Sequence, residues 1–304
     1  MANIVLRLVK SSLQPSSIPT YRRAWKLFYQ FLFNTLPGTS TNIPISPPTL
    51  ALFIAYLFDH HYASSTVNSY VSAIGYSHKL AGLHDPTKSF FINQMLKGYG
   101  KIGCRLDSRL PITLPILHRI VWATSQLSDS FFNTCRFQAM CLFAFYTFAR
   151  VGEITASASG TTIYLHQVSK LVNDNQEAVA FKVTFLNYKH NYNKSPFSLT
   201  ISRQTICCPV QHFLAYLQAR GNTPGPLFQM PNGSPVPRAV FTEKLSTALK
   251  FCGLDPTRYK GHSFRIGAAT HAAEKGMSDA QIRTMGRWKS NAFLKYIRLQ
   301  SMSI

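Results

Sequence analysis

The sequence predicts a mostly α-helical protein with a small antiparallel β-sheet, divided into two domains. Apolar residues recur at helical spacing through most of the chain, whereas β-branched and aromatic residues concentrate within residues 162–202. A glycine- and proline-containing stretch at residues 97–115 has the composition of an interdomain linker. With 304 residues, the chain is long enough for two domains that each have a hydrophobic core.

The N-terminal part is predicted to contain a loose arm at residues 1–14 and a helical domain at residues 15–103. Four helices are expected in this domain, because a capping residue or a proline precedes each segment with helical periodicity. These helices should start at Ser17-Ile18-Pro19, Ser46-Pro47, Ser65 and Asp85-Pro86. Their aromatic residues are interpreted as core, because residues that stack on bases must be exposed. They include Trp25, Phe28, Phe31, Phe53, Phe90 and Phe91.

The second domain is expected at residues 115–304, after a linker at residues 104–114. It should begin with two helices, one from Pro115 to about Leu127 and an apolar one from about Ser130 into Arg150. Three strands are then expected, and two further helices should follow them. The strands are T-I-Y-L at 162–165, A-V-A-F-K-V-T-F-L at 178–186 and P-F-S-L-T-I at 196–201, and the helices start at Cys208-Pro209 and about Ala239.

Residues 261–298 should form three short helices. Ser263 is the expected cap of the first helix, and Ser278 with Gln281 has the capping-box spacing that starts the second at Asp279. The third should begin after Ser290 and carry Tyr296.

The composition favours a polyanionic partner. Lysine and arginine total 32 against 11 acidic residues, a formal net charge of +21 that is spread along the chain. Nucleic acid is the leading candidate, because a polyanion offsets the self-repulsion of such a charge. An acidic membrane surface is a weaker candidate, since no basic amphipathic segment dominates. The six cysteines show no C-x-x-C spacing and no signal peptide is recognised, so we expect reduced intracellular thiols.

Several side chains suggest chemistry on a phosphate. His262 and Arg265 are three residues apart and can face one side of a helix. A guanidinium matches phosphate oxygens with paired donors, and the phenol of Tyr296 can attack phosphorus. Arg150 ends a strongly apolar helix and therefore needs a counter-anion or a water-filled cleft. Glu153 could orient Arg150, although the two side chains could equally form a purely structural pair.

A predicted hairpin tip between the last two strands carries two lysines, Lys189 and Lys194. Either amine could be solvated, or it could reach into a phosphate site. Trp288 lies at the break between the second and third C-terminal helices.

Taken together, these pieces resemble the tyrosine recombinase (phage integrase) family. The resemblance depends on A-R-V-G-E-I around Arg150, the hairpin lysine, H-S-F-R at 262–265 and the tyrosine after G-R-W. It covers the whole chain and is strongest to recombinases of DIRS-like and Ngaro-like retrotransposons. It implies a helical core-binding domain that contacts DNA, at residues 15–103, and a catalytic domain at residues 115–304.

The resemblance also implies a role for each residue. Two arginines would clamp the scissile phosphate, and Tyr296 would attack it to form a 3′-phosphotyrosyl bond with release of a 5′-hydroxyl. His262 would assist proton movement and Lys189 would protonate the leaving oxygen. Trp288 would pack on the phosphate, and Glu153 would support the first arginine. The implied catalytic residues are Arg150, Lys189, His262, Arg265, Trp288 and Tyr296.

Two assignments leave alternatives. Aligning Gly286 with the family's glycine would put Arg287 in the place of Trp288, but the G-R-W wording favours Trp288. Lys194 is the alternative to Lys189, which lies nearer the end of the incoming strand. The chemistry implies no cofactor and no metal, and the sequence has neither a carboxylate cluster nor a G-x-x-x-x-G-K-[ST] loop.

The expected activity is therefore DNA strand cleavage and rejoining, in the service of mobile-element integration. The implied partners are double-stranded DNA and further copies of the chain, as a dimer or tetramer on DNA, with no membrane. A nuclear location follows only from the resemblance to eukaryotic elements. A catalytically silent DNA-binding protein derived from a recombinase and a type IB topoisomerase-like enzyme are the alternatives.

Overall fold

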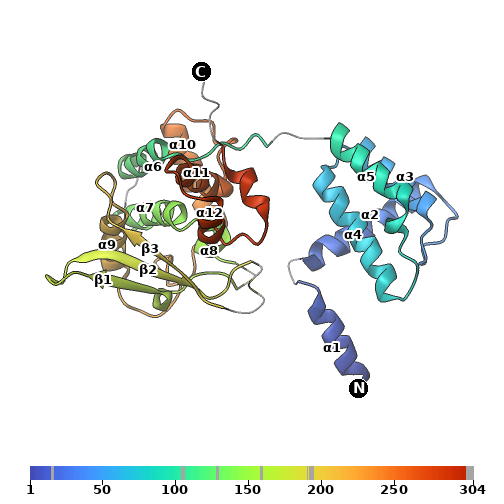
Figure 1. Ribbon diagram of the computed structural model, residues 1–304, viewed down its shortest axis with the longest axis horizontal. Helices are drawn as coiled ribbons and strands as arrows, with labels where there is room; N and C mark the ends of the chain where they lie inside the picture. The colour runs from blue at the N-terminus through green and yellow to red at the C-terminus, as the bar shows by residue number, and fades with distance from the viewer. Residues whose placement is uncertain are drawn as a thin grey trace. The chain divides into compact units, whose positions relative to one another are not determined.

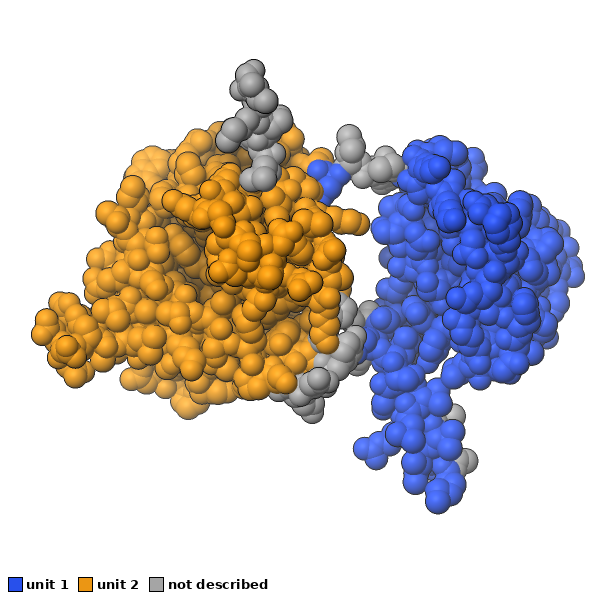
Figure 2. All heavy atoms as spheres, in the orientation of Figure 1, with its two compact units in different colours: residues 1–107 blue, residues 108–304 orange. Residues whose placement is uncertain are grey.

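A computed structural model describes residues 1–14, 17–103, 107–127, 130–157, 160–189, 191 and 195–298. The chain divides into two compact units, residues 1–107 and residues 108–304 (Figure 2). The first unit is helical within its described residues (Figure 1). Its elements are α1 (Ala2–Ser12), α2 (Ile18–Thr35), α3 (Pro47–Asp59), α4 (Ser64–Leu80), the 3₁₀ helix η2 (Pro86–Lys88) and α5 (Phe90–Ile102).

Local capping explains where several of these helices start. The hydroxyl of Ser46 accepts a hydrogen bond from the backbone N–H of Thr49 at 3.2 Å, and Pro47 occupies the first helical position, as predicted. The predicted cap at Ser65 is wrong, because Ala63 is the N-cap and α4 begins at Ser64. The predicted single helix from Asp85-Pro86 is also wrong, because the Asp85 carboxylate caps the short η2 and α5 starts afresh at Phe90.

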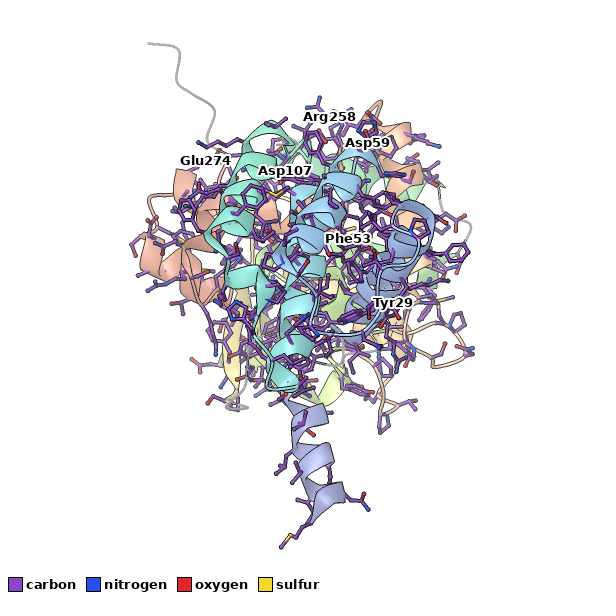
Figure 3. The ribbon with its side chains drawn as sticks, turned by 90° about the vertical axis from the view of Figure 1, so that its right-hand side faces the viewer. Tyr29, Phe53, Asp59, Asp107, Arg258 and Glu274 are labelled. Carbon is purple, nitrogen blue, oxygen red and sulfur yellow. The ribbon has the colours of Figure 1, made fainter. Side chains whose placement is uncertain are left out.

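The core of the first unit is aromatic, and most of the aromatic residues that were predicted to lie in it do so. Phe28 and Phe53 are fully buried, and their ring centroids lie 5.1 Å apart in an edge-to-face arrangement. Phe53 lies among the helices in Figure 3, which also labels the more exposed Tyr29. The prediction was wrong for Phe90 and Phe91, which are 76% and 59% exposed because the first turn of α5 turns both rings outward.

The predicted loose arm is helical over most of its length. The helix α1 presents Ile4, Val5 and Leu8 to solvent, each more than half exposed. Near its end, the Ser12 hydroxyl lies 3.3 Å from the Tyr76 hydroxyl of α4.

The second unit combines helices with one small sheet (Figure 1). Its helices are α6 (Leu114–Leu127), α7 (Phe131–Tyr146), α8 (Val151–Ile154), η3 (Leu165–Gln167), α9 (Pro209–Arg220), α10 (Arg238–Phe251), α11 (Gly261–Glu274), α12 (Asp279–Met285) and η4 (Asn291–Tyr296). Its strands are β1 (Val168–Val172), β2 (Ala178–Phe185) and β3 (Phe197–Ser202).

The sheet is antiparallel with the order β1-β2-β3, so the predicted sheet type is confirmed. The last residue pair of β2 and β3 before the connecting hairpin is Phe185 with Phe197. The predicted strand at T-I-Y-L is wrong, since Tyr164 forms only an isolated bridge with Pro226 and β1 begins at Val168. The sheet packs on α9, where the Phe181 and Phe213 rings lie 4.8 Å apart.

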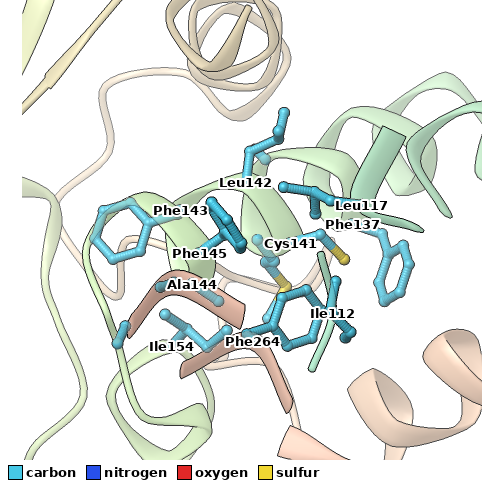
Figure 4. Close-up of a cluster of buried hydrophobic side chains, with 14 of the residues drawn as sticks. Ile112, Leu117, Phe137, Cys141, Leu142, Phe143, Ala144, Phe145, Ile154 and Phe264 are labelled. Carbon is cyan, nitrogen blue, oxygen red and sulfur yellow. The ribbon is translucent and has the colours of Figure 1, made fainter. Parts of the chain in front are cut away.

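The core of the second unit is built around α7, almost every side of which is buried. Cys141 of α7 lies beside Phe264 of α11 and beside Ile112, which precedes α6 (Figure 4). A helix this apolar on all sides is typical of a domain centre. Within the described ranges, no helix is both long and apolar enough to cross a membrane.

Two details of the predicted helices in this unit are wrong. The helix α7 ends at Tyr146, and Phe148 adopts the left-handed conformation with φ of 52°, so Arg150 is the N-cap of α8 and not the end of α7. Ser263 is the third residue of α11, and its hydroxyl accepts from the backbone N–H of the true N-cap, Lys260, at 3.0 Å.

The segment that enters the second unit is attached to α11. The backbone N–H of Ile112 donates to the carbonyl of Ser263 at 2.9 Å, and the Ile112 side chain is fully buried. Gly267 lies against the Ile112 backbone, so closely that a β-carbon at residue 267 would overlap the Ile112 carbonyl. Residues 110 and 112, which fall in the predicted linker, are therefore held by the second unit.

Candidate active site

Tyr296 is delivered by η4, which is held against α11. The Ser290 hydroxyl caps η4, and the side chain of Phe293 is buried in the core of the second unit. The Thr270 hydroxyl of α11 donates to the Tyr296 carbonyl at 3.3 Å and accepts from the Arg298 backbone N–H at 3.0 Å. These contacts fix the backbone of the tyrosine while its ring remains partly exposed.

The Tyr296 ring lies between an imidazole and an indole. Its centroid is 6.1 Å from that of His262, with the two rings nearly parallel, and 5.1 Å from that of Trp288. His262 lies in the first turn of α11, whereas Trp288 follows the end of α12. The three rings that the sequence predicts to be catalytic are therefore in one place.

Arg265 lies beneath these rings and is 1% exposed. Its Nη1 donates to the carbonyl of Phe148 at 2.5 Å, and its Nη2 donates to the carbonyl of Gly286. The Trp288 ring covers the guanidinium at 3.9 Å, and the Tyr296 ring lies 5.8 Å from it. The Nε–H of Arg265 has no hydrogen-bond partner among the described residues.

Arg150 and Glu153 pair with each other, and the carboxylate pairs with a second arginine as well. Arg150 Nη1 lies 3.1 Å from Glu153 Oε1, and the Arg150 backbone N–H donates to Oε2 at 2.9 Å. Arg287 Nη2 donates to the same Oε2 at 2.8 Å, with both of these side chains nearly inaccessible to solvent. From the sequence, Arg287 is only an alternative to Trp288, and its ion pair with Glu153 leaves no signal in the motif.

The site is strongly positive before any ligand binds. Arg150, Arg265 and Arg287 surround one carboxylate, Glu153. Burial lowers the pKa of the Arg265 guanidinium well below its usual value, and the charges of Arg150 and Arg287 lower it further. Since arginine stays protonated in proteins, this field raises the free energy of the empty site. A bound anion would relieve it.

His262 is neutral over a wider pH range than a free histidine. Partial burial lowers the pKa of its imidazole, and the positive charges of Arg109, Arg265, Arg150 and Arg238 lower it further. By surface area His262 is nevertheless exposed, since it lies in the first turn of α11. A neutral imidazole next to a phenol can accept a proton from it.

Of the two hairpin lysines, only Lys189 lies among the described residues, and it is not part of this cluster. Lys189 lies in an exposed turn after β2, and among the contacts of the described residues none joins its side chain to the cluster. The ring centroid of its neighbour Tyr188 lies 5.9 Å from the guanidinium carbon of Arg287. Lys194 lies outside the described residues. Over the same described residues, no three His, Cys, Asp or Glu side chains gather into a possible metal site.

The structure thus brings together all of the predicted site residues except the lysine. They are Arg150, Glu153, His262, Arg265, Trp288 and Tyr296. Their catalytic roles remain predictions.

The structure is similar to solved structures of tyrosine recombinases and integrases. A lambda integrase dimer bound to a COC′ core site matches with a TM-score of 0.64 and 13% identity, covering 100% of this chain and 79% of that chain. The XerH site-specific recombinase bound to a palindromic difH substrate, in a post-cleavage complex, matches with a TM-score of 0.66 and 15% identity, covering 92% and 75%. The Tn1549 transposon integrase in complex with transposon right end DNA matches with a TM-score of 0.59 and 10% identity, covering 91% and 95%.

At these identities the similarity shows the fold, which is that of the tyrosine recombinases. No protein-family model matches the sequence, and neither does any curated protein.

Proposed function

We propose that this chain is a DNA recombinase or integrase that cleaves and rejoins duplex DNA through a 3′-phosphotyrosyl intermediate. The observation that carries the proposal is the packing of the Tyr296 ring beside His262 and Trp288, 5.8 Å from the Arg265 guanidinium. The shared fold with DNA-bound integrases supports it.

In the proposed reaction, the Tyr296 oxygen attacks the scissile phosphorus and the bond from phosphorus to the 5′-oxygen breaks. His262 accepts the phenol proton, and Lys189 gives a proton to the departing oxygen, which leaves as a 5′-hydroxyl. Rejoining is the reverse attack by a 5′-hydroxyl on the phosphotyrosine, so no external energy source is required.

The cationic cluster suits the transition state of this reaction. The pentacoordinate phosphorus carries more negative charge on its oxygens than the resting phosphodiester does, and fixed guanidiniums stabilise that increase. Arg150 and Arg265 supply this charge in the proposal. Glu153 compensates only part of the positive field, so the remainder is available to the phosphate.

DNA binding must change the conformation of the site. Arg265 is buried under the Trp288 ring, and its terminal nitrogens are occupied by the carbonyls of Phe148 and Gly286. In the proposed mechanism, the indole moves off the guanidinium and phosphate oxygens replace these carbonyls. The charge-assisted bonds to phosphate are stronger than those to neutral carbonyls, which favours the exchange.

The proposed partners are two DNA duplexes and further copies of the chain. The lambda integrase in the matched structure is a dimer on its core site, and we propose a dimer or tetramer here. The integration of a mobile element, of a DIRS-like or Ngaro-like kind, and a nuclear location belong to the same proposal.

The test is capture of the covalent adduct. Because the target sequence is not known, the substrate is a pool of duplexes with randomised sequence around a nick, so that the short cleaved piece diffuses away. Wild type should yield DNA that remains attached to protein after denaturation and is released by protease. Tyr296→Phe keeps the ring and its packing but removes the nucleophile, so it should bind the pool equally and yield no adduct.

Other outcomes separate the alternatives. Equal DNA binding by both proteins with no adduct from either would identify a silent DNA-binding protein. Relaxation of supercoiled plasmid without strand exchange would instead indicate a topoisomerase-like enzyme.

A further inference from the structure

Arg287 occupies a position that is unfavourable for an arginine. It is 6% exposed, and its backbone is left-handed, with φ of 53°. Residues with side chains rarely adopt this conformation, and a buried charge requires a partner. Its contacts must therefore offset both penalties.

The first contact of Arg287 is with Glu153. Its Nη2 donates to Glu153 Oε2 at 2.8 Å, while the other carboxylate oxygen lies 3.1 Å from Arg150 Nη1. Its Nη1 donates to the carbonyl of Thr147 at 3.2 Å, in the turn between α7 and α8. Arg287 therefore fixes the carboxylate that orients Arg150, and also the turn that leads into it.

The second contact of Arg287 is with the base of the lysine-bearing hairpin. Its guanidinium lies 3.7 Å from the Phe185 ring centroid and 5.9 Å from that of Phe197. These two residues are the last pair of β2 and β3 before the hairpin at residues 186–196, where Lys189 lies.

The third connection runs through the backbone of Arg287 itself. The preceding carbonyl, that of Gly286, accepts from Arg265, and the following ring, that of Trp288, covers the Arg265 guanidinium. Anchoring Arg287 therefore anchors the loop at residues 286–288 against Arg265.

We infer that Arg287 is a positioning residue for the cleavage reaction, an inference that rests on the proposed function. For the reaction it holds Arg150 through Glu153, and in the DNA-free protein it also anchors the loop that places Trp288 over Arg265. It is not assigned a contact with the phosphate, because its side chain is buried and its terminal nitrogens donate to Thr147 and Glu153.

The test begins with Arg287→Met. Methionine keeps an unbranched side chain against Phe185 but removes the donors to Glu153, so Arg150 loses its fixed orientation. The single-turnover rate of adduct formation at saturating DNA should fall about tenfold to hundredfold, the loss expected from a small misplacement of a reacting group. DNA affinity should change by less than about twofold, since most affinity comes from contacts along the phosphate backbone. Arg287→Lys, which can still reach Glu153, should recover part of the rate.

A second substrate separates positioning from a loss of stability. A methylphosphonate at the scissile position removes the negative charge that Arg150 neutralises. If Arg287 acts through Arg150, the rate defects of Arg287→Met and Arg150→Ala should both shrink on this neutral substrate. A defect caused by partial unfolding would be equal on both substrates, and that result would overturn the inference.

Arg220 supplies the matched control. It is also 6% exposed, and it donates to the carbonyls of Leu227 and Pro226 in a loop outside the cluster. Arg220→Met removes a buried guanidinium of equal exposure, and should leave the adduct rate unchanged below its unfolding temperature. If it slows the adduct as much as Arg287→Met does, burial alone explains both variants and the inference fails.

A DNA-free measurement keeps the two hypotheses distinguishable. In a Trp25→Phe, Trp122→Phe background, Trp288 is the remaining indole, and Arg287→Met should shift its emission to longer wavelength as the ring leaves Arg265. Absence of any adduct with wild type would reject the proposed function, and this shift would still support the loop anchoring. An unshifted spectrum, or a wild-type adduct rate in Arg287→Met, would overturn the role of Arg287.

Discussion

Glu153 carries one negative charge between the guanidiniums of Arg150 and Arg287, and its two ion pairs differ in their exposure to solvent. Its pair with Arg287 is almost inaccessible to water, whereas Arg150 is 23% exposed. Breaking a buried ion pair by removing one partner costs about 3–5 kcal/mol, because the other charge stays buried and unpaired. Arg150 can be compensated by solvent or by a bound phosphate. The arginine that is free to change its partner is therefore the one assigned to the substrate.

The protonation of His262 should determine how the reaction rate depends on pH. Burial and nearby guanidiniums lower the pKa of its imidazole, so the ring becomes protonated at a lower pH than a free histidine, whose pKa is about 6.5. The acid limb of the adduct rate should therefore have its midpoint below pH 6.5, and His262→Gln should be slow with this limb removed. The measurement is the single-turnover rate from pH 5 to pH 8.

His271→Gln is the control, because burial also lowers the pKa of His271, on the same helix. It should keep the limb, and an unchanged limb in His262→Gln would contradict the role of His262. A lowered histidine pKa also makes the free energy of unfolding depend on pH. A depressed histidine pKa contributes stability above about pH 6.5, which is lost as the pH falls toward the folded pKa.

At the scale of elements, the sequence predicts those helix starts that depend on local capping. Ser46-Pro47 and the pair Ser278 and Gln281 are examples, because the capping groups are neighbours in sequence. The turn between α7 and α8 could not be predicted, since neither glycine nor proline marks it. Phe148 is left-handed there, and its carbonyl accepts from Arg265, more than a hundred residues later.

In the candidate site, too, the residues with a local sequence signal could be predicted, and those that depend on distant contacts could not. His262 and Arg265 could be placed on one helical turn from their spacing, and the motif resemblance added Arg150, Trp288 and Tyr296. The contribution of Arg287 depends on Glu153 and on Phe185 of β2, and neither contact leaves a local signal in the sequence.

The packing of α11 depends on Gly267, which has no side chain to separate the helix from Ile112. In Gly267→Ala the new methyl group would overlap the Ile112 carbonyl, so the helix and the preceding segment must separate. Overpacking of this kind costs about 1–3 kcal/mol, and more where backbone is the obstacle. Gly98→Ala in α5 is the same substitution with no atom within 4 Å of the new carbon. It should stabilise by about 0.5–1 kcal/mol, the helical preference of alanine over glycine. Urea unfolding should give changes of opposite sign, and equal changes would contradict the packing argument.

At the scale of the whole molecule, the formal charge of +21 governs how the proposed DNA partner is bound. Each phosphate that a lysine or arginine neutralises releases a counterion, so affinity falls steeply with salt. Between 50 and 200 mM salt, affinity for a random duplex should fall about 10³-fold or more, as measured by fluorescence anisotropy. Tyr296→Phe should show the same slope, because it removes no charge. A change below about tenfold would argue against a large electrostatic interface.

The attachment of Ile112 to α11 determines where the chain can be cut if the second unit is to be studied alone. A fragment that starts at residue 108 retains the peptide that covers Gly267. One that starts at residue 115 removes it, and leaves an open slot along the helix that bears His262 and Arg265. The second unit therefore begins several residues before α6, its first helix.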